Sequence, residues 1–104
     1  MTWWGSGALV FGAALLSGAP TEPRRHEVEI RGMAFHPAVL EVASGDTVVW
    51  VNRDIVPHTA TAKPAWDTGT LTQGRYGTIV SRQPGEFRYV CTLHPTMRGT
   101  LVTR

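Results

Sequence analysis

Thr47-Val48-Val49-Trp50-Val51-Asn52 is the stretch that decides the fold. Its β-branched and aromatic residues are apolar on both faces, a pattern typical of a central strand covered on two sides. On its N-terminal side, residues 26–31 alternate polar and apolar side chains, as a half-buried strand does. On its C-terminal side, Phe87, Tyr89 and Cys91 share one face of a further strand. The pattern around the central stretch is therefore that of a sheet.

Short strands continue along the rest of the chain, separated by turn signals every 8–12 residues. We expect them near residues 39–42, 58–62, 76–81, 87–91 and 99–103. Residues 63–74 are irregular and carry at most one short strand near Thr70. No long helical period is present. The sequence predicts an all-β protein, a Greek-key β-sandwich of about seven to eight strands.

Length and composition limit the possible functions. The chain has 104 residues, 42% of them hydrophobic and 17% charged, which indicates one folded domain. A domain this small rarely encloses a large catalytic cavity. The ten Lys and Arg residues outnumber Asp and Glu by only two. Because they form no basic stripe, we expect no nucleic-acid partner.

The N-terminus resembles a targeting segment. Residues 1–19 are apolar and uncharged, too short for a standard membrane span, and end in small residues where signal cleavage needs them. Residues 20–25 form a polar linker, and the domain is expected over 26–104. A cleaved signal, an uncleaved anchor through residues 3–19 and a buried helix remain open. The first two predict a periplasmic or otherwise exported protein, touching a membrane only if uncleaved.

Candidate metal ligands cluster near the C-terminus. Cys91, His94 and Met97 place a thiol, an imidazole and a thioether three residues apart. These soft and borderline donors suit copper better than magnesium or calcium. His58, in the connection after the central strand, is the best candidate for a second imidazole. Two imidazoles and a thiolate with a weak axial thioether make the blue-copper arrangement.

Two segments carry a family resemblance. Residues 45–54 followed by Pro57-His58-Thr59 resemble the first ligand segment of cupredoxins, and residues 91–99 resemble the second. The short Cys-x-x-His-x-x-Met loop is similar to that of amicyanin. The resemblance implies one copper ion held by His58, Cys91, His94 and Met97, and one-electron transfer through Cu(II)/Cu(I). One departure is Leu93, where amicyanin has proline.

The resemblance also suggests how the ligands are supported. We expect the Asn52 side chain to bond to Thr92 and the Asn52 N–H to point at the Cys91 sulfur. The Leu93 N–H, absent in a proline, would be a second donor to that sulfur.

Electrons are expected to pass through a partly exposed His94, while His58 is shielded. An apolar patch of Met33, Pro57, Leu93 and Pro95 around this edge would dock partners briefly. Such partners would be redox proteins: a dehydrogenase, a cytochrome or an oxidase. The protein itself is expected to be a monomer.

Two other function classes remain open. A copper-binding protein for delivery or buffering could use the same fold and ligands. A thiol enzyme with a Cys–His pair would need an open pocket and an oxyanion site, which so small a sandwich hardly offers. Intense blue colour on adding Cu(II) would distinguish an electron-transfer protein from both of these alternatives.

Overall fold

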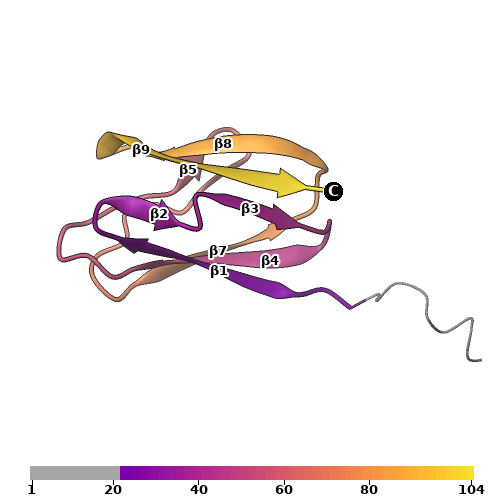
Figure 1. Cartoon of the computed structure of the whole chain (residues 1–104), viewed down its shortest axis with the longest axis horizontal. Helices are drawn as coiled ribbons and strands as arrows, with labels where there is room; N and C mark the ends of the chain where they lie inside the picture. The colour runs from indigo at the N-terminus through magenta and orange to yellow at the C-terminus, as the bar shows by residue number, and fades with distance from the viewer. Residues whose placement is uncertain (1–21) are drawn as a thin grey trace, which may run out of the picture.

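The computed structural model describes residues 22–104, which fold into two layers of strands (Figure 1). One sheet has the order β2-β1-β4-β7, with β1 Arg25–Arg31, β2 Ala34–His36, β4 Asp46–Asn52 and β7 Tyr76–Ser81. The other has the order β3-β9-β8-β5-β6, with β3 Val39–Val42, β9 His94–Thr103, β8 Gly85–Cys91, β5 Thr61–Ala62 and β6 Trp66–Asp67. The predicted all-β sandwich is confirmed, with nine strands in the described part.

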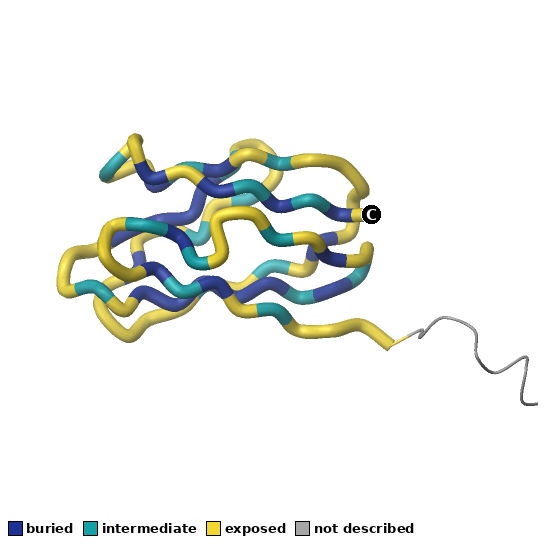
Figure 2. The backbone as a smooth tube through the Cα atoms, in the orientation of Figure 1, coloured by how far each residue is buried: buried dark blue, intermediate teal, exposed yellow. Residues whose placement is uncertain are grey.

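The central strand is β4, as the sequence predicts. It pairs in parallel with β1, where Val28 lies opposite Trp50, and antiparallel with β7, where Val48 lies opposite Ile79. Val48 and Trp50 are completely buried. Buried positions occur along the strands of both sheets (Figure 2), and the buried apolar side chains form one core cluster.

An aromatic cluster fills this core. The Trp50 ring lies 5.3 Å from the Tyr89 ring and 5.6 Å from the Trp66 ring, and Phe35 meets Tyr89 edge-on at 4.7 Å. Such pairs add to the apolar area that they bury. Trp66 is thus a packing residue, and the strand face of Phe87, Tyr89 and Cys91 points into the core as expected.

Five features of the strand pattern differ from the sequence prediction. The strands β2 and β6 are new, and β9 begins at His94 rather than near Gly99. Of residues 58–62, only Thr61–Ala62 form a strand, while His58 makes an isolated bridge to Leu71. That bridge replaces the strand expected near Thr70. The physical reason is length, since strands of two or three residues leave almost no alternation to detect.

The two ends of the sandwich hold different segments, and the candidate ligands lie at one of them. We call the end that holds the turn from β1 to β2, the connection after β4 and the turn from β8 to β9 the ligand end. The start of β1 and Arg104 lie at the opposite, terminal end (Figure 1). The expected targeting segment and the first two linker residues, 20 and 21, lie outside the described residues, and β1 begins one residue before the predicted domain boundary. No helix in residues 22–104 is long and apolar enough to cross a membrane.

Candidate metal centre

A thiol and an imidazole face each other at the ligand end. Cys91 is the last residue of β8, His58 lies in the connection after β4, and both are completely buried. Their Sγ and Nδ1 atoms are 3.7 Å apart. A metal with bonds of about 2.3 Å to sulfur and about 2.0 Å to nitrogen, at an angle of about 120°, separates its two donors by about 3.7 Å. The pair is therefore spaced to share one ion.

The second imidazole lies beside this pair. His94 begins β9 directly across from Cys91, because the two-residue turn Thr92-Leu93 brings these positions opposite each other. The His94 and His58 rings have centroids 5.1 Å apart. His94 is partly exposed whereas His58 is buried, as the sequence analysis expects of the electron-exchanging histidine. Met97, further along β9, is buried at 4% exposure.

The chemistry of the donor set carries the metal assignment. Within residues 22–104, no three His, Cys, Asp or Glu side chains already converge closely enough to enclose an ion by themselves. A thiolate, two imidazoles and a thioether in one region nevertheless form the ligand set of blue-copper sites. The 3.7 Å spacing of His58 and Cys91 agrees with it.

Thr59, rather than Asn52, supports the cysteine loop. The Thr59 N–H donates to Cys91 Sγ at 3.3 Å, and Thr59 Oγ1 accepts the Thr92 N–H at 2.9 Å. The Thr59 and Thr92 hydroxyls are also hydrogen-bonded, at 3.1 Å. The expected contacts of Asn52 with Thr92 and with the sulfur are therefore wrong.

Asn52 instead braces its own connection. Its Nδ2 donates to the carbonyls of Val56 and Leu71, its Oδ1 accepts the Asp54 N–H, and its backbone N–H donates to the Arg75 carbonyl. Asn52 is the last residue of β4 and its side chain bonds back to the connection that follows, whereas Thr59 directly follows the candidate ligand His58. The sequence signal for Thr59 was this adjacency, which carries its N–H and hydroxyl to the cysteine loop.

Leu93 does not contribute a second donor to the sulfur. Among the described residues, the only backbone N–H that bonds to Cys91 Sγ is that of Thr59. Leu93 occupies the tip of the turn and is 48% exposed. Its expected hydrogen bond to the sulfur is absent from this structure.

Asp54 is a site residue that the sequence analysis missed. Its Oδ2 lies 2.8 Å from His58 Nε2, so the imidazole presents Nδ1 toward the sulfur. Burial raises the pKa of Asp54, but hydrogen bonds from Met33 and His58 outweigh it, so this pKa lies below its ordinary value. A carboxylate behind a ligand histidine fixes its tautomer and orientation. The signal in the sequence was an acidic residue four positions before His58.

The four expected docking residues all lie exposed at the ligand end. Met33 is 45% exposed, Leu93 is 48% exposed, and Pro57 and Pro95 are exposed as well. The connection after β4 adds two apolar side chains that the sequence analysis did not include, Ile55 at 84% and Val56 at 41% exposure. This end of the protein thus shows apolar side chains from three separate segments.

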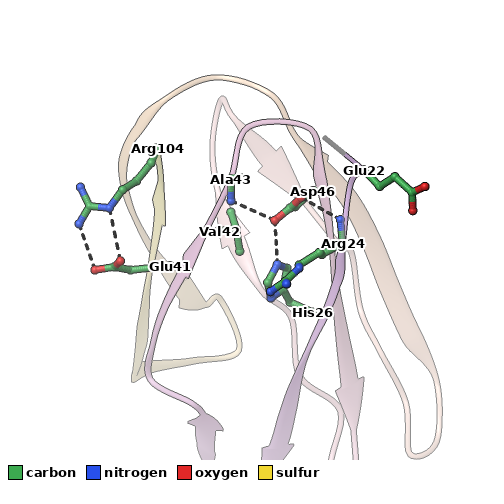
Figure 3. Close-up of a pocket in the computed structure, with 8 residues that line it drawn as sticks. All are labelled: Glu22, Arg24, His26, Glu41, Val42, Ala43, Asp46 and Arg104. Atoms are coloured by element: carbon green, nitrogen blue, oxygen red, sulfur yellow. Dashed lines mark hydrogen bonds and ion pairs between the residues drawn. The ribbon is translucent and has the colours of Figure 1, made fainter. Parts of the chain in front are cut away.

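The terminal end contains a polar pocket away from the ligand set. It has a volume of about 400 Å³, and Asp46 lies in its wall (Figure 3). Asp46 accepts N–H groups of Arg24 and Ala43 and contacts His26 Nε2 at 2.9 Å. The interpretation of His26 as a solvated surface residue is therefore wrong. His36, the other histidine given this interpretation, is half-buried and contacts the Arg31 carbonyl.

Comparisons with known proteins agree with this geometry. Residues 5–103 match the model of the cupredoxin-like domain family. The chain is 30% identical over 81 residues to an amicyanin of Paracoccus versutus and 31% identical to one of Paracoccus denitrificans. Each match covers 72% of this chain and 61% and 62%, respectively, of the relative.

Solved structures show the same fold. A point variant of amicyanin in its oxidised state has a TM-score of 0.73 at 28% identity, with 77% of this chain and 82% of that chain covered. A copper-containing nitrite reductase of Thermus scotoductus has a TM-score of 0.73 at 30% identity. That match covers 84% of this chain but only 24% of the reductase. The chain belongs to the cupredoxin-like domain family and is similar within it to amicyanin.

Proposed function

We propose that this protein is a small blue-copper electron carrier whose ligands are His58, Cys91, His94 and Met97. The observation that carries the proposal is the buried His58–Cys91 pair at 3.7 Å, with the partly exposed His94 ring beside it. The cofactor is one copper ion, in keeping with the cupredoxin family. When bound, it supplies a one-electron Cu(II)/Cu(I) couple.

The protein's own residues set up this couple. Cys91 supplies a thiolate in a buried place, where the Thr59 N–H stabilises its charge. His58 is held from behind by Asp54, and the buried Met97 would supply the thioether as a weak donor. His94 connects the buried site to the surface, and its exposed edge is the route by which an electron enters or leaves.

Addition of Cu(II) to the purified apoprotein tests the proposal. We expect intense blue colour from thiolate-to-copper charge transfer, bleached by a reductant and restored by an oxidant. Cys91→Ser removes the thiolate and should give a colourless protein. Colourless copper binding by the unaltered protein would contradict electron transfer and favour copper delivery or buffering.

We further propose that partners dock as redox proteins on the apolar patch of Met33, Pro57, Leu93 and Pro95. An apolar surface suits brief contact, because few ion pairs or hydrogen bonds have to break when the partner dissociates. Electron self-exchange between Cu(I) and Cu(II) copies, measured by NMR line broadening, needs no identified partner. Pro95→Glu should slow it while the blue colour persists. Val80→Glu, on the exposed face of β7, is the matched control and should leave the rate unchanged.

The last part of the proposal is export as a monomer, with residues 1–19 acting as a signal or anchor. The apolar composition of this segment and the polar linker after it support this interpretation. Cell fractionation and sequencing of the mature N-terminus test both possibilities, a cleaved signal and an uncleaved anchor. A cytoplasmic protein that keeps Met1 would contradict them.

A further inference from the structure

One carboxylate at the ligand end joins two separate segments of the chain, the turn from β1 to β2 and the connection after β4. Asp54 Oδ1 accepts the Gly32 N–H at 2.7 Å, and Oδ2 accepts the Met33 N–H at 3.0 Å. The same Oδ2 lies 2.8 Å from His58 Nε2. The Asp54 side chain is 17% exposed, and the Asp54 backbone N–H donates to Asn52 Oδ1. A carboxylate with three donors is fixed in place, and so are the groups that it holds.

The turn that Asp54 holds has an unusual backbone. Gly32 and Met33 form a two-residue turn between Arg31 and Ala34, which pair as the last residues of β1 and the first of β2. Both turn residues have positive φ, +61° and +62°. Glycine and asparagine suit such positions, whereas a methionine is unfavourable there because its Cβ crowds the backbone.

Core packing does not account for the methionine. Its side chain is 45% exposed and does not belong to the core cluster. Met33 lies in the turn from β1 to β2, at the end of the sandwich where β9 starts with His94 (Figure 1). An unfavourable backbone that presents an exposed side chain next to a site points to a role at that site.

We propose that Asp54 is a positioning residue that couples the exposed Gly32–Met33 turn to the ligand His58. An apolar partner surface that presses on Met33 moves the turn, and the two N–H groups carry the movement to the carboxylate. The carboxylate in turn orients the His58 ring. This coupling rests on the proposed function, since it gives the docking surface a direct connection to a metal ligand.

The experiment uses the full-length apoprotein, so copper binding and electron transfer do not enter the result. The ring nitrogens of His58 and the amide exchange of Gly32 and Met33 are followed by NMR in four proteins. These are the unaltered chain, Met33→Gly, Asp54→Asn and the double variant. Met33→Gly keeps the turn while removing the side chain and the backbone strain. Val80→Ala removes a similarly exposed apolar side chain remote from Asp54 and is the control.

We expect Met33→Gly to shift the His58 ring signals in the unaltered background but not in the Asp54→Asn background. Asp54→Asn should also mix the two neutral tautomers of His58. It should accelerate Gly32 and Met33 amide exchange about tenfold or more, as fits the loss of hydrogen bonds to a charged acceptor. Val80→Ala should leave all of these signals in place.

Two results would overturn the coupling. One is a Met33→Gly variant that leaves His58 unmoved, and the other is an equal shift with and without the Asp54 carboxylate. If Asp54→Asn does not fold, Asp54→Glu replaces it. The longer side chain still reaches His58 but displaces the two turn N–H groups, so the same uncoupling is expected. A negative NMR result does not affect the Cu(II) test of the proposed function. A colourless protein in that test does not affect the NMR measurement, which uses the apoprotein.

Discussion

The backbone N–H of Thr59 lies 3.3 Å from the sulfur of Cys91, although 32 residues separate them in the chain. The same residue accepts the Thr92 N–H through its hydroxyl. Thr61 donates a further hydrogen bond to this hydroxyl and contacts Asp67. The segment after the candidate ligand His58 thus fixes the segment after the candidate ligand Cys91, and Thr59 is the residue where they meet.

Replacing Thr59 by valine should therefore loosen the cysteine loop. Valine keeps the shape of the side chain but leaves the Thr92 N–H without its acceptor, which costs about 1–3 kcal/mol of stability. Thr59→Ser retains the hydroxyl and should lose less. Urea unfolding of the apoprotein measures both. Equal stabilities of the two variants would show that the hydroxyl does not hold the loop.

Leu93→Pro should leave the reduction potential of the copper protein unchanged. The sulfur receives its N–H from Thr59, so removing the Leu93 N–H takes nothing from it. Leu93→Ala, which keeps that N–H, is the matched control, and cyclic voltammetry compares the two. A potential lowered in the proline variant alone would reinstate Leu93 as a donor to the sulfur.

Gly99→Ala should be strongly destabilising. A Cβ at Gly99 would clash with the ring of the buried Tyr89, which packs edge-on against Phe35 and Trp50. Overpacking of this kind costs about 1–3 kcal/mol or more. At Gly77 the added Cβ would meet Thr68, a half-buried loop residue, at 2.8 Å. Thermal unfolding should show a smaller loss for Gly77→Ala than for Gly99→Ala; the reverse order would contradict the packing argument.

Acid should remove a stabilising contribution of Asp46. The Arg24 N–H and the contact with His26 lower the pKa of Asp46 from 3.8 to about 2. A carboxylate with a depressed folded-state pKa stabilises the fold above its unfolded pKa, and this contribution disappears as the pH falls from about 4 toward 2.

The variant Asp46→Asn isolates this effect. Its melting temperature should lie below that of the unaltered protein at pH 6, and the gap should narrow between pH 4 and pH 2. Asp67, the exposed residue of β6, also has a lowered pKa, so the melting temperature of Asp67→Asn is measured over the same pH range as a second carboxylate variant. A gap for Asp46→Asn that stays constant down to pH 2 would contradict the assignment.

Much of the fold could be predicted because the long strands carry strong patterns. β4 is apolar on both faces and is covered on both faces, and β1 alternates as a strand with one buried face should. The two-residue strand β6 could not be found this way, and β5 was found only as part of a longer expected strand over residues 58–62. Their pairing depends on neighbours distant in the chain, such as Val90 opposite Thr61.

The candidate ligands could also be proposed from sequence, because Cys91, His94 and Met97 are close together in the chain. Their supports could not. The sequence predicts a hydrogen bond from Asn52 to the cysteine loop, but the Asn52 amide donates to the carbonyls of Val56 and Leu71 instead. Which hydroxyl or carboxylate reaches a ligand depends on loop conformation, and the hydrophobic pattern does not encode it.

Both the start of β1 and the last residue, Arg104, lie at the end of the sandwich opposite His94 (Figure 1). A tether fused at either position would leave the histidine edge facing away from whatever holds the protein. On an electrode coated with a binder for such a tag, every molecule would then present the same face to solution. Direct contact between electrode and site would instead call for a graft near Leu93, at the tip of the turn from β8 to β9.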